Sequence, residues 1–206
     1  MPDLGATLAL VLYAGGAVVL FGVRSWQQRR LTGSAGFNGF SRNRSAWAKA
    51  AGMMFGVALL AGLAAPVLAA VRVTDIVRPG GLWGVALTGL GLLLTVNGFV
   101  FAALAQQGMG RSWRIGVDPS EETELIIGGL FGLARNPIFT GMMAAQAGTV
   151  LLAPTGLGLA GAVLLLIACE LQVRKVEEPH LVHTHGRSYL EYSGQVGRFL
   201  PGVSRL

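Results

Sequence analysis

The fold is decided by one long apolar segment, Asn136–Cys169, which reads NPIFTGMMAAQAGTVLLAPTGLGLAGAVLLLIAC. Its 34 residues include no Asp, Glu, Lys or Arg. One helix of that length would measure about 50 Å, whereas the hydrocarbon core of a bilayer is about 30 Å thick. Pro154-Thr155-Gly156 interrupts the segment near its centre, and these residues favour a turn. The segment therefore predicts a helical hairpin with arms at Pro137–Ala153 and from Leu157 to about Val176, the second continuing beyond the membrane.

Three further segments are long and apolar enough to cross a bilayer, namely Leu4–Val23, Ala50–Val71 and Leu82–Leu104. The whole chain of 206 residues is 52% hydrophobic and only 13% charged, which is about half the charged share of a soluble domain. Its mean hydropathy is +0.58. These features predict an all-α integral membrane protein with about five transmembrane helices. Because Cys169 is the only cysteine, a disulfide framework, a Cys-rich zinc site and an iron–sulfur cluster are excluded.

The basic residues are distributed unequally between the loops. Fourteen of the 16 Lys and Arg residues fall in loops and a tail on one side of the predicted membrane, and only Arg72 and Arg78 fall on the other. The positive-inside rule then predicts an external N-terminus and a cytoplasmic C-terminus. This topology accounts for the net charge of +6 without a nucleic-acid partner. Fourteen Arg against two Lys favour a GC-rich bacterial source, and hence a bacterial inner membrane.

Dense polar chemistry is confined to two segments on the predicted cytoplasmic side, Gln106–Arg135 and Arg174–Leu206. We therefore expect two regions: residues 1–105 supply three membrane spans, and residues 106–206 form the region that would hold any active site. Such a site is expected where the loop before the hairpin meets the C-terminal tail.

Arg135-Asn136-Pro137 has the residues of a helix start, since Asn is a favoured N-cap and Pro a favoured first residue. The free N–H groups of such a start attract an anionic group, and Arg135 would add to that attraction. The alternative is a plain helix start whose arginine extends to lipid phosphates.

Acidic residues lie near the end of the last span. Glu170, Arg174 and Glu177 share one helical face, and a carboxylate at membrane depth is costly enough to indicate function. The alternative is an interfacial ion pair without a further role. The next residue, Glu178, forms with Glu177 an acidic pair that could face a cationic ligand.

Two other patterns have weaker implications. Glu177 and His180 have a spacing that binds metals on a helix, but Pro179 is expected to break the helix, so no metal site is predicted. His183 and His185 then belong to a histidine-rich turn. The pair Gly52-x-x-x-Gly56 predicts a close helix contact, within the monomer or in a homodimer.

Three separated motifs resemble the isoprenylcysteine carboxyl methyltransferase family, which is itself similar to the phospholipid methyltransferases. They cover about half of the chain, from Gln106 to Gly202, and their order and spacing make the resemblance specific. The first motif is Gly110–Ile115 (GRSWRI) with Glu124–Ile126 and Gly129–Phe131, the second is Arg135–Gly141 (RNPIFTG), and the third is Glu177-Glu178, Gly186-x-x-Tyr189-x-x-Tyr192 and Arg198–Pro201 (RFLP). The chain departs from the family pattern in having Asn136 for the commoner His, Phe139 for Tyr, and Pro179-His180 after the acidic pair.

The resemblance implies S-adenosylmethionine as the cofactor, S-adenosylhomocysteine as the product, and no metal. The helix start at Asn136 suits the cofactor's carboxylate, and Glu177 or Glu178 suits its ammonium and sulfonium groups. The positions that match the family's cofactor contacts are Glu124, Leu125, Ile126, Phe131, Asn136, Pro137, Ile138, Phe139 and Glu177.

The expected reaction is methyl transfer to a small or lipophilic acceptor, through a carboxylate, an amine or a hydroxyl, at the cytoplasmic face. A lipophilic acceptor would enter laterally between the spans, in contact with membrane lipids. We expect Arg135, Glu178, Tyr189 and Arg198 to be catalytic, and Trp113, Glu170 and Arg174 to bind the acceptor. Only an amine or hydroxyl acceptor needs a general base, for which Glu178, His183 and Tyr189 are candidates.

Two other classes of function remain at this point. One is an NADPH-dependent membrane reductase of the sterol-reductase type, which has a similar C-terminal half. The other is a small transporter or scaffold without enzymatic activity. The oligomeric state, monomer or homodimer, is open.

Overall fold

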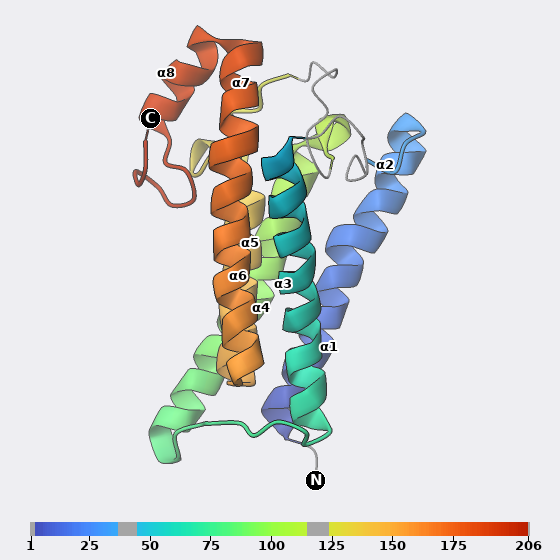
Figure 1. Ribbon diagram of the computed structural model, residues 1–206, viewed down its shortest axis with the longest axis vertical. Helices are drawn as coiled ribbons and strands as arrows, with labels where there is room; N and C mark the ends of the chain where they lie inside the picture. The colour runs from blue at the N-terminus through green and yellow to red at the C-terminus, as the bar shows by residue number, and fades with distance from the viewer. Residues whose placement is uncertain (1–2, 37–44, 115–123, 206) are drawn as a thin grey trace.

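The computed structural model describes residues 3–36, 45–114 and 124–205. Within these ranges all regular structure is helical, which confirms the all-α prediction. Figure 1 shows an elongated bundle, with the N-terminus at one end and the helices α7 and α8 at the other. We call the latter the α7–α8 end. The last residue of the predicted motif GRSWRI, Ile115, lies outside the described residues.

The first long helix is continuous from Leu4 to Thr32. It consists of α1 (Leu4–Ala17), a π-helical segment (Val18–Val23) and α2 (Arg24–Thr32). It is longer than the predicted span because the polar residues of α2 continue the same helix beyond the apolar part. The next two helices are α3 (Ala46–Ala70) and α4 (Gly81–Gly108), which lie within a few residues of the predicted spans.

The predicted hairpin is present as α5 (Pro137–Leu152) and α6 (Gly156–Gln172). The Thr155 hydroxyl caps α6 by accepting a hydrogen bond from the Gly158 N–H at 3.1 Å. α5 is an apolar helix of 16 residues, about 24 Å long, and is therefore shorter than a full crossing. Four helices of the described part of the chain are long and apolar enough to span a membrane, so this is a multi-pass membrane protein.

The helix containing α6 does not end at Pro179, so the predicted break there is wrong. It continues through a π-helical turn (Val173–Glu177) into α7 (Glu178–His185). Proline disrupts a regular helix because it has no N–H and its ring crowds the preceding turn. Here Pro179 follows a π turn, in which the Glu178 N–H reaches back five residues to the Val173 carbonyl. This wider turn gives the proline ring room. Gly186, with a φ of +52°, then separates α7 from α8 (Arg187–Gln195).

Glycine brings α4 and α5 into direct backbone contact. A Cβ atom on Gly98 would lie 2.5 Å from the Ala145 nitrogen and 2.6 Å from the Gly141 carbonyl oxygen. One on Gly148 would lie 2.5 Å from the Thr95 nitrogen. Such close approach is how small residues hold membrane helices together.

Among the described residues, no close helix contact is found at Gly56, and Gly52 is exposed. A Cβ atom on Gly56 would have no described atom within 4 Å. The spacing of the two glycines is the same as in a close helix contact, but both line cavities instead, Gly52 together with Phe21 and Phe139, and Gly56 together with Phe21 and Phe99.

We expect Gly98→Ala to destabilise the protein by about 1–3 kcal/mol, because the new methyl group would push α4 and α5 apart. Alanine is otherwise the better helix former, so the loss has to come from the contact. The measurement is the thermal unfolding of the purified protein in detergent.

Gly15→Ala in α1 is the matched control, because a Cβ atom there would meet no described atom within 4 Å. It should leave the unfolding temperature unchanged or slightly higher. Equal unfolding temperatures for Gly98→Ala and wild type would contradict the proposed close contact.

Candidate active site

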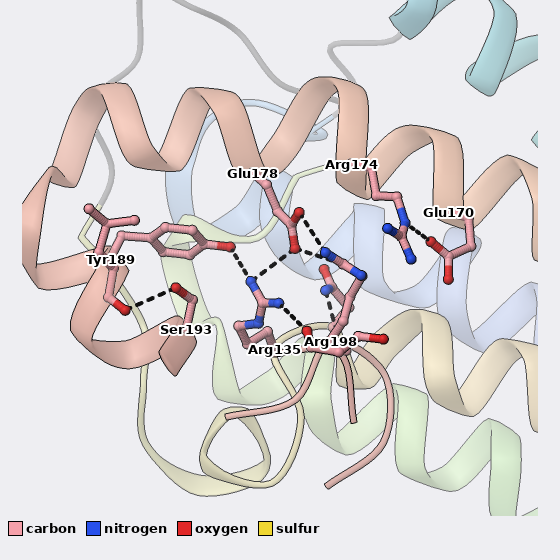
Figure 2. Close-up of polar contacts among 10 residues, drawn as sticks. Arg135, Glu170, Arg174, Glu178, Tyr189, Ser193 and Arg198 are labelled. Atoms are coloured by element: carbon pink, nitrogen blue, oxygen red, sulfur yellow. Dashed lines mark hydrogen bonds and ion pairs between the residues drawn. The ribbon is translucent and has the colours of Figure 1, made fainter. Parts of the chain in front are cut away.

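A buried carboxylate, that of Glu178, lies between two buried guanidinium groups (Figure 2). Arg198 binds it in a bidentate manner, with Nε 2.7 Å from Oε1 and Nη2 3.0 Å from Oε2. Nη1 of Arg135 lies 2.9 Å from the same Oε1. The three residues come from α7, from the segment before α5 and from the C-terminal tail, so the ion pairs join three parts of the chain.

The tail also lies along the start of α5. The N–H of Arg135 donates to the Gly197 carbonyl at 2.9 Å, and the N–H and Nδ2 of Asn136 both donate to the Arg198 carbonyl at 3.0 Å. The Thr140 hydroxyl donates to the Phe199 carbonyl at 2.7 Å. Asn136 therefore has the N-cap position that was predicted, but its side chain holds the tail and does not cap the helix.

Two tyrosines of α8 complete this network. The Tyr189 hydroxyl accepts a hydrogen bond from Arg135 Nη1 at 2.9 Å, and the Tyr192 hydroxyl donates to the Phe131 carbonyl at 2.6 Å. Burial raises the pKa of Tyr189, and the nearby Arg135 offsets this only in part. Burial also raises the pKa of Tyr192, to about 12. Both phenols are therefore protonated at neutral pH, so neither is a base.

Beside this network is a cavity of about 260 Å³, close to the ~300 Å³ lower end of sites for drug-sized ligands. We call it the site cavity. The structure brings together in its lining every position that the sequence predicts to contact a cofactor. These are Glu124, Leu125, Ile126, Phe131, Asn136, Pro137, Ile138, Phe139 and Glu177.

The remainder of the site cavity's lining is partly polar and partly apolar. Next to Glu177 lies Gln172, whose Nε2 donates to Glu177 Oε1 at 3.2 Å. The apolar part comes from the first long helix, α3 and α5, and includes Phe21, Phe55 and Met142. The Phe55 ring meets the Phe139 ring edge to face, with centroids 6.0 Å apart.

The residues predicted to be catalytic or to bind the acceptor occupy different places. Arg135, Glu178, Tyr189 and Trp113 line the site cavity, and Arg198 lies behind it on Glu178. By contrast, Glu170 and Arg174 form a partly exposed ion pair outside the lining (Figure 2).

Trp113 is held in place by the first long helix. Its ring lies under the guanidinium of Arg24, which is 4.8 Å from the ring centroid. Arg24 also donates to the Gly110 carbonyl, and Gln28 Nε2 donates to the Arg111 carbonyl at 2.7 Å. The segment before Trp113 is thereby fixed against α2.

The three histidines do not gather at one site. His180 lines the site cavity, whereas His183 is exposed and lies outside it. In the described part of the chain, no three His, Cys, Asp or Glu residues are close enough to hold a metal ion.

Several lining residues were not identified from the sequence, among them Phe21, Phe55, Gln106, Met142 and Gln172. The apolar ones carry no signal, because a side chain facing lipid and one facing a cavity are equally apolar in a membrane helix. Gln106 and Gln172 are recognisable in the sequence, since a buried carboxamide within an apolar helix requires a hydrogen-bonding partner. Tyr192 was part of a quoted motif, but no role was assigned to it.

We expect Glu178→Gln to destabilise the protein by about 3–5 kcal/mol, because two buried guanidinium groups would lose their carboxylate. Thermal unfolding in detergent measures the loss. The matched control is Glu191→Gln in α8, which breaks an exposed pair with Arg187 and should change the stability by less than about 1 kcal/mol. If the two variants unfold at the same temperature, the ion pairs of Glu178 do not hold the site together.

Comparison with known proteins identifies the family. A family model described as phospholipid methyltransferase matches residues 85–188. A solved structure of the eukaryotic intramembrane Ras methyltransferase ICMT (isoprenylcysteine carboxyl methyltransferase) is similar in fold, with a TM-score of 0.58. The two sequences are 18% identical, over 96% of this chain and 68% of that chain. No curated protein matches the chain. Because the matched residues make up half of the sequence and run from α4 to the start of α8, the chain belongs to the phospholipid methyltransferase family.

Proposed function

We propose that the protein transfers a methyl group from S-adenosylmethionine to a lipophilic acceptor, and that both bind in the site cavity. The observation that supports this most directly is that the lining of the site cavity has two parts of different chemistry. The nine positions that match the family's cofactor contacts form one part, and apolar side chains such as Phe21, Phe55 and Met142 form the other. A water-soluble cofactor and a membrane-soluble acceptor can therefore meet there.

The start of α5 fits the carboxylate of the cofactor. No side chain caps this helix, so the N–H groups of Ile138 and Phe139 lack a capping partner. Both residues line the site cavity, as does Arg135. The cluster of Arg135, Arg198 and Glu178 has two positive charges and one negative charge, which adds to the attraction for an anion.

The remaining groups of the cofactor also have matching residues. Glu177 would hold the ammonium group, with Gln172 orienting its carboxylate. Leu125, Ile126 and Phe131 offer apolar surfaces for the adenine. When bound, S-adenosylmethionine supplies a methyl group on a positively charged sulfur, which is open to in-line attack.

The main tasks of the protein's residues are to align the acceptor with the methyl group and to exclude water. Glu178 is held by two arginines and Tyr189 remains protonated, so neither is placed to remove a proton. We therefore assign positioning roles to Arg135, Glu178, Tyr189 and Arg198, since they fix the start of α5 and the tail.

The acceptor's reactive group decides whether a base is required. A carboxylate acceptor needs none, whereas an amine or hydroxyl acceptor has to lose a proton. His180 lines the site cavity and His183 does not, so His180 is the histidine placed for that step. Trp113 would contact the acceptor. Glu170 and Arg174 lie outside the lining, and we propose no contact of theirs with a bound acceptor.

We further propose that the α7–α8 end faces the cytoplasm of a bacterium, with the protein in the inner membrane. The support is the sequence: 14 of 16 basic residues lie in segments that this topology places inside.

Calorimetric titration of the detergent-purified protein tests the cofactor. We expect S-adenosylmethionine and S-adenosylhomocysteine to bind, and NADPH not to bind. Glu177→Gln should weaken the binding of S-adenosylmethionine about tenfold or more, because a charge-assisted hydrogen bond in a buried site is lost.

Glu170→Gln is the matched control, being a glutamate on the same continuous helix but outside the site cavity. It should leave the affinity unchanged. If NADPH alone binds, the protein is a reductase and the proposal fails. If S-adenosylmethionine binds equally to wild type and Glu177→Gln, the cofactor lies elsewhere.

A further inference from the structure

The outer face of α4 is a continuous stripe that no described helix covers. Its residues recur every three or four positions and all of them are exposed. They also lie opposite the glycine face that packs on α5. We call this the α4 stripe; it comprises Leu82, Ala86, Gly89, Leu93, Asn97, Val100 and Leu104.

Asn97 is the polar exception in this apolar stripe. It lies 16 residues after the start of α4 and 11 before its end, which places it about 24 Å and 17 Å from the two ends. Its carboxamide is therefore at the depth of the hydrocarbon core. Nδ2 donates one hydrogen bond to the Leu93 carbonyl at 2.8 Å. Among the described residues, the oxygen and the second N–H have no partner.

An amide facing hydrocarbon is costly, because lipid tails offer no hydrogen bond. Membrane proteins relieve this cost by pairing polar side chains between helices. A partner at Asn97 must therefore provide both a donor and an acceptor within the membrane, at the same depth.

We propose that the α4 stripe is the contact surface of a homodimer in which Asn97 pairs with Asn97 of a second copy. Copies inserted in one orientation are related by a two-fold axis along the membrane normal, so their α4 helices run parallel. The two asparagines then lie at equal depth. Each has one free N–H and one free carbonyl oxygen, which is what two reciprocal hydrogen bonds require.

The rest of the α4 stripe fits the same arrangement. Its spacing of three and four residues is that of an interface between parallel helices. Gly89 lies two turns before Asn97, and a Cβ atom there would meet no described atom within 4 Å. A glycine at this position allows the two helix backbones to approach closely. No residue of the stripe lines the site cavity.

The test is the dimer dissociation constant in lipid vesicles, measured by energy transfer between copies labelled at a cysteine added after Leu206. Cys169 is fully buried and does not compete for the label. We expect wild type to dimerise. Asn97→Leu should raise the dissociation constant about tenfold, since reciprocal hydrogen bonds in membranes are worth roughly 1–2 kcal/mol. Asn97→Gln, which keeps the carboxamide, should lose less.

Gly89→Leu adds a bulky side chain within the α4 stripe and should also weaken the dimer. Gly15→Leu is its matched control, because Gly15 is an exposed glycine of α1 with equally open surroundings. A monomeric wild type, or equal dissociation constants for wild type and Asn97→Leu, would overturn the proposal. The proposal would also be overturned if Gly15→Leu raised the dimer dissociation constant as much as Gly89→Leu. None of these outcomes depends on methyl transfer, so the dimer and the proposed function fail separately.

Discussion

The arrangement of the site depends on the burial of one carboxylate, that of Glu178, between Arg135 and Arg198. Each of these charges would be costly to bury alone, and the cost is offset only while all three remain together. The segment before α5, the end of the long C-terminal helix and the tail are therefore held in one geometry. Without that constraint, the start of α5 and the polar wall around Glu177 would not face the same cavity.

The membrane helices provide the frame on which this network is built. Glycines at the contact of α4 and α5 allow the two backbones to touch, which sets how closely α5 packs against α4. The π turn before Pro179 keeps α6 and α7 in one continuous helix. It carries the chain past the proline, so that Glu177 and Glu178 remain on a continuous helix. A regular α-helix would be kinked or broken at the proline, because the ring crowds the preceding turn.

The site cavity has a consequence for how the two ligands of the proposed reaction would meet. Its lining combines polar side chains such as Gln172 and Glu177 with apolar side chains such as Phe21 and Phe55. An acceptor can keep its tail among membrane helices while its polar end reaches the cofactor. The outer face of α4 takes no part in this, which leaves it available for contact with a second copy.

The membrane spans, the hairpin and the grouping of the polar motifs were predictable from the sequence, because length and hydropathy decide what crosses a bilayer. The nine positions gathered in the site cavity were predictable through their family motifs. The wider helical turn at Pro179, the tail-binding role of Asn136 and the places of Glu170 and Arg174 were not predictable. Nor was the apolar wall of the cavity. In a membrane helix, residues that face lipid, another helix or a cavity are all apolar, so periodicity does not distinguish them. Only the tertiary structure decides which faces meet, because that depends on backbone contact and on buried charges that come together from distant parts of the chain.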